Sequence, residues 1–277
     1  MSTPTREQAL QPQPVPPAEL AHRPSHIGRT VLVTGAGQGI GAAIALAFGR
    51  RRAKVAVTDI DAVRAEAIAA QIRAEGGAAA AGACDVADYN QLATACTALQ
   101  TALGSHIDTI INNAGISPKH GGRAHKVWEM SPDEWARVTA VNLTGAFNTV
   151  RLLSPAMIEA RFGAVVNMSS IAGRAYSDIV GIHYAATKAG LIGFTRHAAA
   201  ELGPYNIRVN AIAPGRIETP LIRMVSAEVN EGQVQATPLR RLGQPEEVAD
   251  LALYLTSNEA SFVTGQVCDV AGGLMMT

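Results

Sequence analysis

The apolar and polar positions along the chain alternate between two patterns. Short runs of β-branched and other apolar residues are typical of buried strands, whereas longer segments with apolar residues three or four apart are typical of helices. The short runs predict strands over 30–34, 54–58, 78–84, 107–112, 163–168, 206–212 and 263–270. The longer segments predict helices over 40–52, 61–75, 88–103, 182–202 and 244–256, and one more that begins at Ser131.

Local signals support two of these helix starts. Ser131, Pro132 and Glu134 occupy the N-cap, first and third helical positions, which together predict a capping box. Asp61 stands directly before the second helix and is its expected N-cap.

Strands and helices alternate throughout the chain, which indicates a parallel sheet with helices on both faces. The predicted fold class is α/β: a single doubly wound, mostly parallel seven-stranded sheet of the Rossmann type. No linker or internal repeat divides residues 28–277, so we expect one domain there. Six of the 14 prolines fall within the first 24 residues. Because proline lacks an N–H and fixes φ, we expect residues 1–27 to form an extended tail, either a simple tether or a partner-binding segment.

Composition narrows the class of protein. The 277 residues are 48% hydrophobic and 17% charged, which is enough apolar content for a sizeable core. Lys+Arg and Asp+Glu are both 23, so the net charge is zero and a nucleic-acid partner is not expected. No apolar run is long enough to cross a membrane and the N-terminus lacks a signal h-region. Three scattered cysteines suggest a reducing, cytoplasmic location, and no metal site is expected.

A glycine-rich loop joins the first strand to the first helix, with the sequence TGAGQGIG over 34–41. Glycines at that junction let the backbone approach a pyrophosphate, which is attracted to the helix N-terminus. The second strand ends at Asp59, 18 residues after Gly41. A carboxylate there accepts hydrogen bonds from ribose hydroxyls and repels a 2′-phosphate. Arg64 is expected to face outward, so the cofactor predicted is NAD rather than NADP.

Tyr184 and Lys188 stand at positions i and i+4 of a predicted helix and therefore share one face. A free tyrosine has a pKa of ~10, which is too high for efficient proton transfer near neutrality. A neighbouring ammonium lowers that pKa, so the pair predicts a proton-transfer site for an alcohol or carbonyl oxygen. His183, next to Tyr184, points elsewhere on the helix and is expected to pack or to line the site.

Together these motifs resemble the short-chain dehydrogenase/reductase family, in particular its 3-oxoacyl-carrier-protein-reductase-like members. The resemblance covers residues 28–277 and rests on TGAGQGIG, CDV at 84–86, NNAG at 112–115, VNLTG around Asn142, Ser169-Ser170, YxxxK and Pro214-Gly215. It implies an NAD-binding dehydrogenase/reductase domain in which Tyr184 is the general acid/base, Lys188 supports it and holds the nicotinamide ribose, Ser170 binds the substrate oxygen and Asn142 joins a proton relay. The cofactor-binding residues that it implies are Gly35, Gly37, Gln38, Gly39, Ile40, Gly41, Asp59, Ile60, Asp85, Val86, Asn113, Ala114, Gly115, Tyr184, Lys188, Pro214, Gly215, Ile217 and Thr219. Asn112 and Asn210 are expected to be structural.

The resemblance leaves the substrate open. It implies a secondary alcohol or ketone, and a homotetramer in which the Asn142 and Tyr184 helices form one interface and the last strand another. Three segments, 117–126, 174–183 and 219–241, are expected to frame the substrate pocket. Residues 117–126 carry several cations and are expected to be a solvated basic loop, although an anionic substrate is conceivable. Residues 219–241 are expected to form a lid. The alternatives are an NADP-dependent 3-oxoacyl thioester reductase and a non-catalytic nucleotide-binding sensor or scaffold.

Overall fold

The computed structural model describes residues 26–220, 222 and 227–276. Seven strands form one sheet in the order β3-β2-β1-β4-β5-β6-β7, and every neighbouring pair is parallel. The strands are β1 (Thr30–Thr34), β2 (Lys54–Asp59), β3 (Ala78–Ala83), β4 (Thr109–Asn112), β5 (Gly163–Met168), β6 (Ile207–Pro214) and β7 (Val267–Val270). The predicted fold class is confirmed, with a sheet that is entirely parallel.

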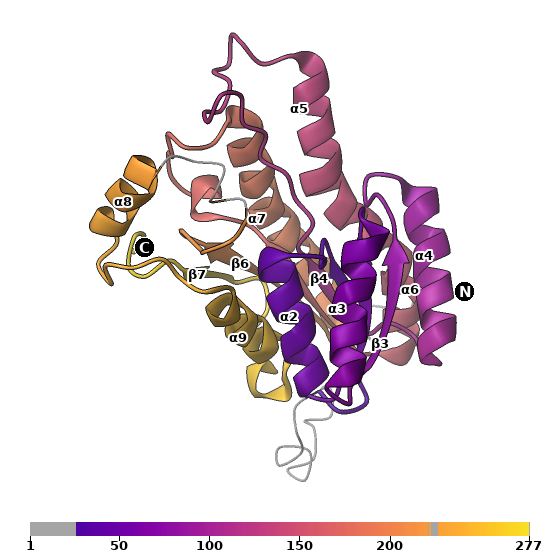
Figure 1. The fold of residues 1–277 in the computed structure, drawn as a ribbon. Helices are drawn as coiled ribbons and strands as arrows, with labels where there is room; N and C mark the ends of the chain where they lie inside the picture. The colour runs from indigo at the N-terminus through magenta and orange to yellow at the C-terminus, as the bar shows by residue number, and fades with distance from the viewer. Residues whose placement is uncertain (1–25, 221, 223–226, 277) are drawn as a thin grey trace.

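Helices cover both faces of this sheet. The helices are α2 (Gly39–Arg50), α3 (Ala62–Ala74), α4 (Tyr89–Leu103), α5 (Pro132–Thr139), α6 (Gly145–Ala160), α7 (Ile182–Leu202), α8 (Ala227–Ala236) and α9 (Pro245–Thr256). Figure 1 shows α2, α3 and α9 on the viewer's side of the sheet, whereas α4, α6 and α7 pack against the other side. No described helix is long and apolar enough to cross a membrane.

Alternating strand residues supply the two cores. Val31 and Val33 face the helices α2, α3 and α9, and Leu32 between them faces α4, α6 and α7. All three side chains are fully buried. Because both faces are covered, the strands are continuous apolar runs rather than amphipathic ones.

The strand order reverses between β1 and β4, since the chain leaves β1 toward β2 and β3 and returns to β4. In doubly wound sheets, ligands bind at the carboxyl ends of the strands beside such a reversal. The loops that follow β1 and β4 contain TGAGQGIG and NNAG, so the fold brings these two predicted motifs together.

Several predicted boundaries change. The fourth strand begins at Thr109 rather than Ile107, and the last strand is limited to Val267–Val270. The helix expected from Ser131 is observed as α5, a π-helical turn at Ala140–Thr144 and α6, and α8 lies in the segment expected to be a lid. Residues 1–25 of the predicted tail lie outside the described residues, but His26 is fully buried with its ring edge against Phe48, so the packed chain includes it.

The predicted capping box at Ser131 is only half formed. The Ser131 hydroxyl accepts a hydrogen bond from the Glu134 N–H at 3.1 Å, as expected. The Glu134 carboxylate, however, turns away from the helix N-terminus and contacts His120, His125 and His183. Three imidazoles contact that carboxylate. Spacing within one helix could not predict these contacts, because the histidines come from other segments of the chain.

Candidate active site

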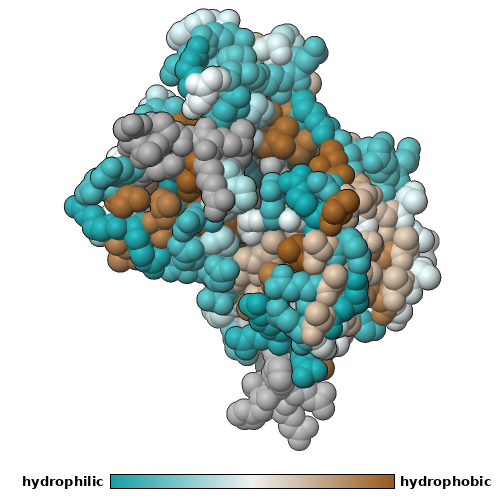
Figure 2. Space-filling model, in the orientation of Figure 1, coloured by the Kyte–Doolittle hydropathy of each residue, from teal (hydrophilic) through white to brown (hydrophobic). Residues whose placement is uncertain are grey.

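A cleft opens at the carboxyl ends of the strands. On the face shown in Figure 2, a hollow lies above the amino end of α2, beside apolar residues. Its lining includes these predicted residues: Gly35, Gln38, Gly39, Ile40, Gly41, Asn113, Gly115, Ser170, Tyr184, Lys188, Pro214, Gly215, Ile217 and Thr219. The other predicted residues, Gly37, Asp59, Ile60, Asp85, Val86, Ala114 and Asn142, lie outside this lining.

The glycine loop is held in a conformation that favours glycine. Gly35 and Gly39 have φ values of +61° and +58°, in the left-handed region. A Cβ on Gly41 would stand 2.3 Å from the Gly35 carbonyl oxygen and 2.4 Å from Asn113 Nδ2. Asn113 Nδ2 in turn donates to the carbonyl oxygens of Thr34 and Gly35, both at 2.9 Å. The loop, the start of α2 and the NNAG segment therefore pack with no room for a side chain, which fits a pyrophosphate held by backbone N–H groups.

Asp59 lies beside this loop at the end of β2. Its carboxylate accepts a hydrogen bond from the Gly37 N–H at 2.9 Å and another from the Asp61 N–H at 3.0 Å. Arg64 is exposed, as expected, yet it lies beside the glycine loop. Its guanidinium donates to Asp61 Oδ2 at 2.8 Å and to Gln38 Oε1 at 2.9 Å, which places a cation at the edge of the glycine loop. Asp61 also caps α3, as expected.

The segment after β3 borders the same end of the cleft. Asp85 accepts a hydrogen bond from the Arg137 guanidinium at 2.7 Å. Val86 is buried against Gly145, and a Cβ on Gly145 would stand only 2.6 Å from the Val86 side chain. Ile60 is 65% exposed, so its side chain is free to cover a flat ring system from the solvent side.

The reactive end is built on α7. Tyr184 lies within its first turn and Lys188 one turn later, with Lys188 Nζ 5.4 Å from the Tyr184 ring centroid. Lys188 is almost fully buried, and its ammonium donates to the Met168 carbonyl oxygen at 2.6 Å. Ser170, two residues after β5, accepts a hydrogen bond from the Ala172 N–H at 3.2 Å, and its hydroxyl acts on the pKa of Tyr184. Serine, tyrosine and lysine thus converge at one point of the cleft.

Burial dominates the electrostatics of this group. It raises the pKa of Tyr184, and the hydrogen bond with the Ser170 hydroxyl only partly opposes that rise. The same burial lowers the pKa of Lys188 to about 8, so the ammonium remains mostly protonated at neutral pH. The net direction for Tyr184 is opposite to the one expected from the lysine alone. A phenol that keeps its proton at neutrality is suited to donate it to a carbonyl oxygen.

Asn142 lies in a π-helical turn, Ala140–Thr144, between α5 and α6. Its amide accepts from the Ile116 N–H at 2.8 Å and donates to the Ile116 carbonyl oxygen at 3.0 Å. Asn142 Oδ1 and Lys188 Nζ both lie 3.5 Å from the point where a Cβ on Gly115 would stand. Asn142 and Lys188 therefore face each other across Gly115.

The segment after β6 forms the opposite wall of the cleft. Ile217 pairs with Gly243 in an isolated bridge, and the Thr219 methyl group lies 3.5 Å from the Cβ position of Gly39. A Cβ on Gly215 would stand 2.9 Å from the Ala271 Cα. The loops after β1 and β6 thus approach each other closely.

Ser117 and Lys119 line the cleft, as expected for the segment 117–126 that should frame the substrate pocket, although that segment was also expected to be a solvated basic loop. Sequence reasoning missed Arg216, which lies between Gly215 and Ile217 and also lines the cleft. Sequence spacing also did not reveal one cluster: ligand atoms of His120, His125 and Glu134 lie within 4.8 Å of one another. The structural roles of Asn112 and Asn210 are supported, since their amides donate to Asn167 and to the Val263 carbonyl oxygen. His183 is fully buried and packs, as expected.

Comparison with known proteins agrees with this site. Residues 35–275 match the model of a family described as enoyl-(acyl carrier protein) reductase. A 3-oxoacyl-[acyl-carrier-protein] reductase of Thermotoga maritima is 39% identical over 249 residues, which is 90% of this chain and 98% of that one. A crystal structure of a 3-oxoacyl-[acyl-carrier protein] reductase from Brucella melitensis with bound NAD is 56% identical, with a TM-score of 0.87 and coverage of 97% and 99%.

A 7α-hydroxysteroid dehydrogenase in complex with NADH and 7-oxo glycochenodeoxycholic acid is 35% identical, with a TM-score of 0.84 and coverage of 91% and 96%. The chain therefore belongs to the short-chain dehydrogenase/reductase family and is an oxidoreductase that acts on a ketone or CH–OH group with a nicotinamide dinucleotide. Within that family it falls in the branch similar to the 3-oxoacyl-[acyl-carrier-protein] reductases.

Proposed function

We propose that the protein transfers a hydride between NAD(H) and a secondary alcohol or ketone, with Tyr184 as the general acid/base. The observation that carries this proposal is the convergence of Ser170, Tyr184 and Lys188 on the cleft that also contains the glycine loop and the start of α2. One site thus combines a dinucleotide-binding turn with a proton-transfer group.

Each residue of the site has its own role in the proposed reaction. Bound NADH supplies the hydride, and the protein must hold the carbonyl and exchange one proton. Ser170 donates a hydrogen bond to the substrate oxygen, and Tyr184 donates its proton to that oxygen as the hydride arrives at carbon. The Lys188 ammonium stabilises the phenolate that is left. Asn142 lies opposite Lys188 across Gly115. It takes part in the proton relay through which the phenolate regains its proton.

The charge beside the glycine loop supports NAD over NADP. Asp59 and Asp61 are carboxylates and Arg64 is the cation near them, and Arg64 is already paired with Asp61. One negative charge is left over, on Asp59, where a 2′-phosphate would come closest. The position of Arg64 is the observation that favours the alternative cofactor, because a phosphate could draw its guanidinium away from Asp61.

Asp59→Ala should therefore reduce the preference for NADH over NADPH by at least about tenfold, since removing a like charge beside a phosphate is worth a kcal/mol or more. The measurement is the ratio of the two dissociation constants. Asp250→Ala on α9, which removes an equally charged but exposed carboxylate, should leave the ratio unchanged. An unaltered ratio in Asp59→Ala would mean that Asp59 does not select the cofactor.

The second candidate function is an NADP-dependent 3-oxoacyl thioester reductase. Its substrate is favoured by the names of the relatives at 39% and 56% identity, and its cofactor only by the position of Arg64. It uses the same residues on a different substrate. Turnover of an acetoacetyl thioester with NADPH, compared with turnover of secondary alcohols with NAD, separates the two. A non-catalytic sensor would turn over neither pair.

We also propose a homotetramer. Phe147 on α6 and Ile182 at the start of α7 are 47% and 49% exposed, and Phe262, shortly before β7, is fully exposed. Apolar side chains at these positions support one interface through α6 and α7 and another beside β7. Light scattering should give four times the chain mass of 28.8 kDa, and a mass of 28.8 kDa would refute the assembly.

A further inference from the structure

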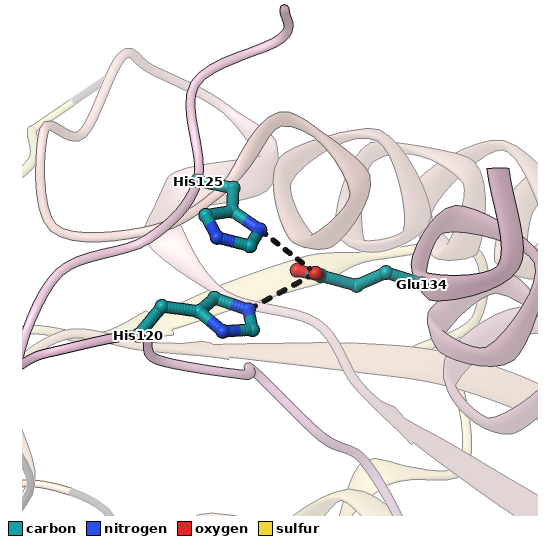
Figure 3. A group of neighbouring side chains, drawn as sticks. All are labelled: His120, His125 and Glu134. Atoms are coloured by element: carbon teal, nitrogen blue, oxygen red, sulfur yellow. Dashed lines mark hydrogen bonds and ion pairs between the residues drawn. The ribbon is translucent and has the colours of Figure 1, made fainter. Parts of the chain in front are cut away.

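We infer that the loop between β4 and α5 carries a zinc-type metal site formed by His120, His125 and Glu134 (Figure 3). Nε2 of His120 and Nδ1 of His125 each lie 3.0 Å from the same carboxylate oxygen, Oε2 of Glu134. The two imidazole rings are stacked, with centroids 3.5 Å apart and planes 2° from parallel. This inference is independent of the proposed function.

The spacing of these atoms suits a tetrahedral ion. Zinc binds imidazole nitrogen and carboxylate oxygen at ~2.0–2.1 Å, which puts neighbouring ligand atoms about 3.3 Å apart. The two nitrogen–oxygen distances are 3.0 Å, and the stacked rings must turn out of their parallel arrangement so that both nitrogens point at one ion. The His120 side chain is 42% exposed, which leaves water free to complete the coordination.

The loop backbone holds the two histidines in place. Gly121 and Gly122 have φ values of +58° and +84°, the combination that a tight type I′ turn requires. His120 and Arg123 exchange backbone hydrogen bonds across this turn. The Arg123 guanidinium then forms two bonds to the Glu129 carboxylate, at 2.6 and 2.7 Å. The cluster is therefore supported by contacts of its own and does not depend on chance contact between mobile side chains.

A buried histidine orients the carboxylate ligand. His183 Nδ1 accepts the Tyr184 N–H at 2.7 Å, so its Nε2 carries the proton and donates to Glu134 Oε1 at 2.9 Å. Hydrogen bonds of this kind fix the orientation of metal ligands. An ion at Oε2 would consequently tie the loop that contains Ser117 and Lys119 to α5 and, through His183, to the start of α7. The metal would stiffen the substrate side of the cleft.

The donor set selects the kind of ion. Two imidazoles and one carboxylate suit zinc and its transition-metal neighbours, whereas Mg²⁺ and Ca²⁺ prefer oxygen ligands alone. The thiols compete poorly, since burial raises the pKa of Cys84 to about 11 and that of Cys96 to about 12. A thiol must lose its proton to bind zinc.

Calorimetric titration of the full chain with zinc, free of any polyhistidine tag, tests the inference. We expect one equivalent to bind and to raise the melting temperature. His120→Gln and His125→Gln should each weaken zinc binding by at least about tenfold, because even changes to residues that support metal ligands lower metal affinity by that much. His106→Gln, which removes an exposed histidine from the turn between α4 and β4, is the matched control and should bind as the wild type does.

Two results would overturn the site: no stoichiometric zinc binding by the wild type, or equal affinity in His120→Gln and His106→Gln. Either one would reduce the cluster to a hydrogen-bonded carboxylate. Visible absorption of the Co²⁺-substituted protein gives a second readout, because a tetrahedral spectrum should appear in the wild type and be lost in His125→Gln. Nucleotide binding is measured separately, so failure here leaves the proposed function standing.

Discussion

Tyr184→Phe should lower kcat by about 10²–10⁴-fold while nucleotide affinity stays near the wild-type value, because only the proton-transfer group is removed. The ring remains in place within α7, and Lys188 keeps its hydrogen bond to the Met168 carbonyl oxygen. A change confined to kcat is the signature of an interaction made in the transition state. Steady-state kinetics with the best alcohol or ketone substrate, together with NADH titration, provide the measurement.

The matched control is Tyr89→Phe, at the exposed start of α4 and outside the lining of the cleft. It should retain wild-type kcat. Hydride transfer that continues at the wild-type rate in Tyr184→Phe would refute the assignment of the general acid, whatever the cofactor proves to be. Loss of nucleotide affinity and kcat together would instead indicate a binding role for the hydroxyl.

Gly41→Ala should destabilise the fold by about 3 kcal/mol, at the upper end of the cost of overpacking, and should abolish tight nucleotide binding. The added Cβ would stand 2.3 Å from the Gly35 carbonyl oxygen and 2.4 Å from Asn113 Nδ2. Neither neighbour can yield easily, since the first is backbone and the second is hydrogen-bonded to Thr34 and Gly35. The start of α2 must therefore move away from β1, which removes the backbone N–H groups from the phosphate position.

Thermal unfolding checks this expectation, and a loss of that size corresponds to a drop of roughly 6–12 °C in Tm for a domain of this length. Gly232→Ala in α8 is the control, because nothing lies within 4 Å of its Cβ position and alanine is the better helix former. That variant should melt at or slightly above the wild-type temperature. A Gly41→Ala protein with unchanged Tm and NADH affinity would contradict the packing described for the glycine loop.

Structural features that are set by residues close together in the chain could be predicted from the sequence. Strand β5 and helix α7 were predicted at their observed bounds, since each has a strong local pattern of apolar residues and a clear end. The last strand was predicted too long because Gly265 adopts a φ of +72° and interrupts the run before Val267. The helix that begins at Ser131 had no predicted end, because a π-helical turn at Ala140–Thr144 and Pro155 inside α6 break its periodicity.

In the candidate site, too, features set by local spacing could be predicted, and features set by contacts between distant segments could not. The glycine loop and the Tyr184–Lys188 pair follow from spacing within one turn or one helix. The raised pKa of Tyr184 could not be predicted, because it arises from burial by several distant segments. The contact of Arg64 with Gln38 could not be predicted for a similar reason, since its guanidinium reaches across to another loop. The histidine cluster joins a turn, helix α5 and helix α7, and no periodic pattern connects them.

Calorimetric titration of the purified protein with NADH and, in parallel, with NADPH tests the central claim most directly, because it asks whether the cleft binds the nucleotide that the charge at Asp59 favours. The account predicts stoichiometric NADH binding at least about tenfold tighter than NADPH binding, the margin set by one unpaired carboxylate beside the ribose. Tighter binding of NADPH would contradict the cofactor assignment, and binding of neither nucleotide would contradict the proposed function itself.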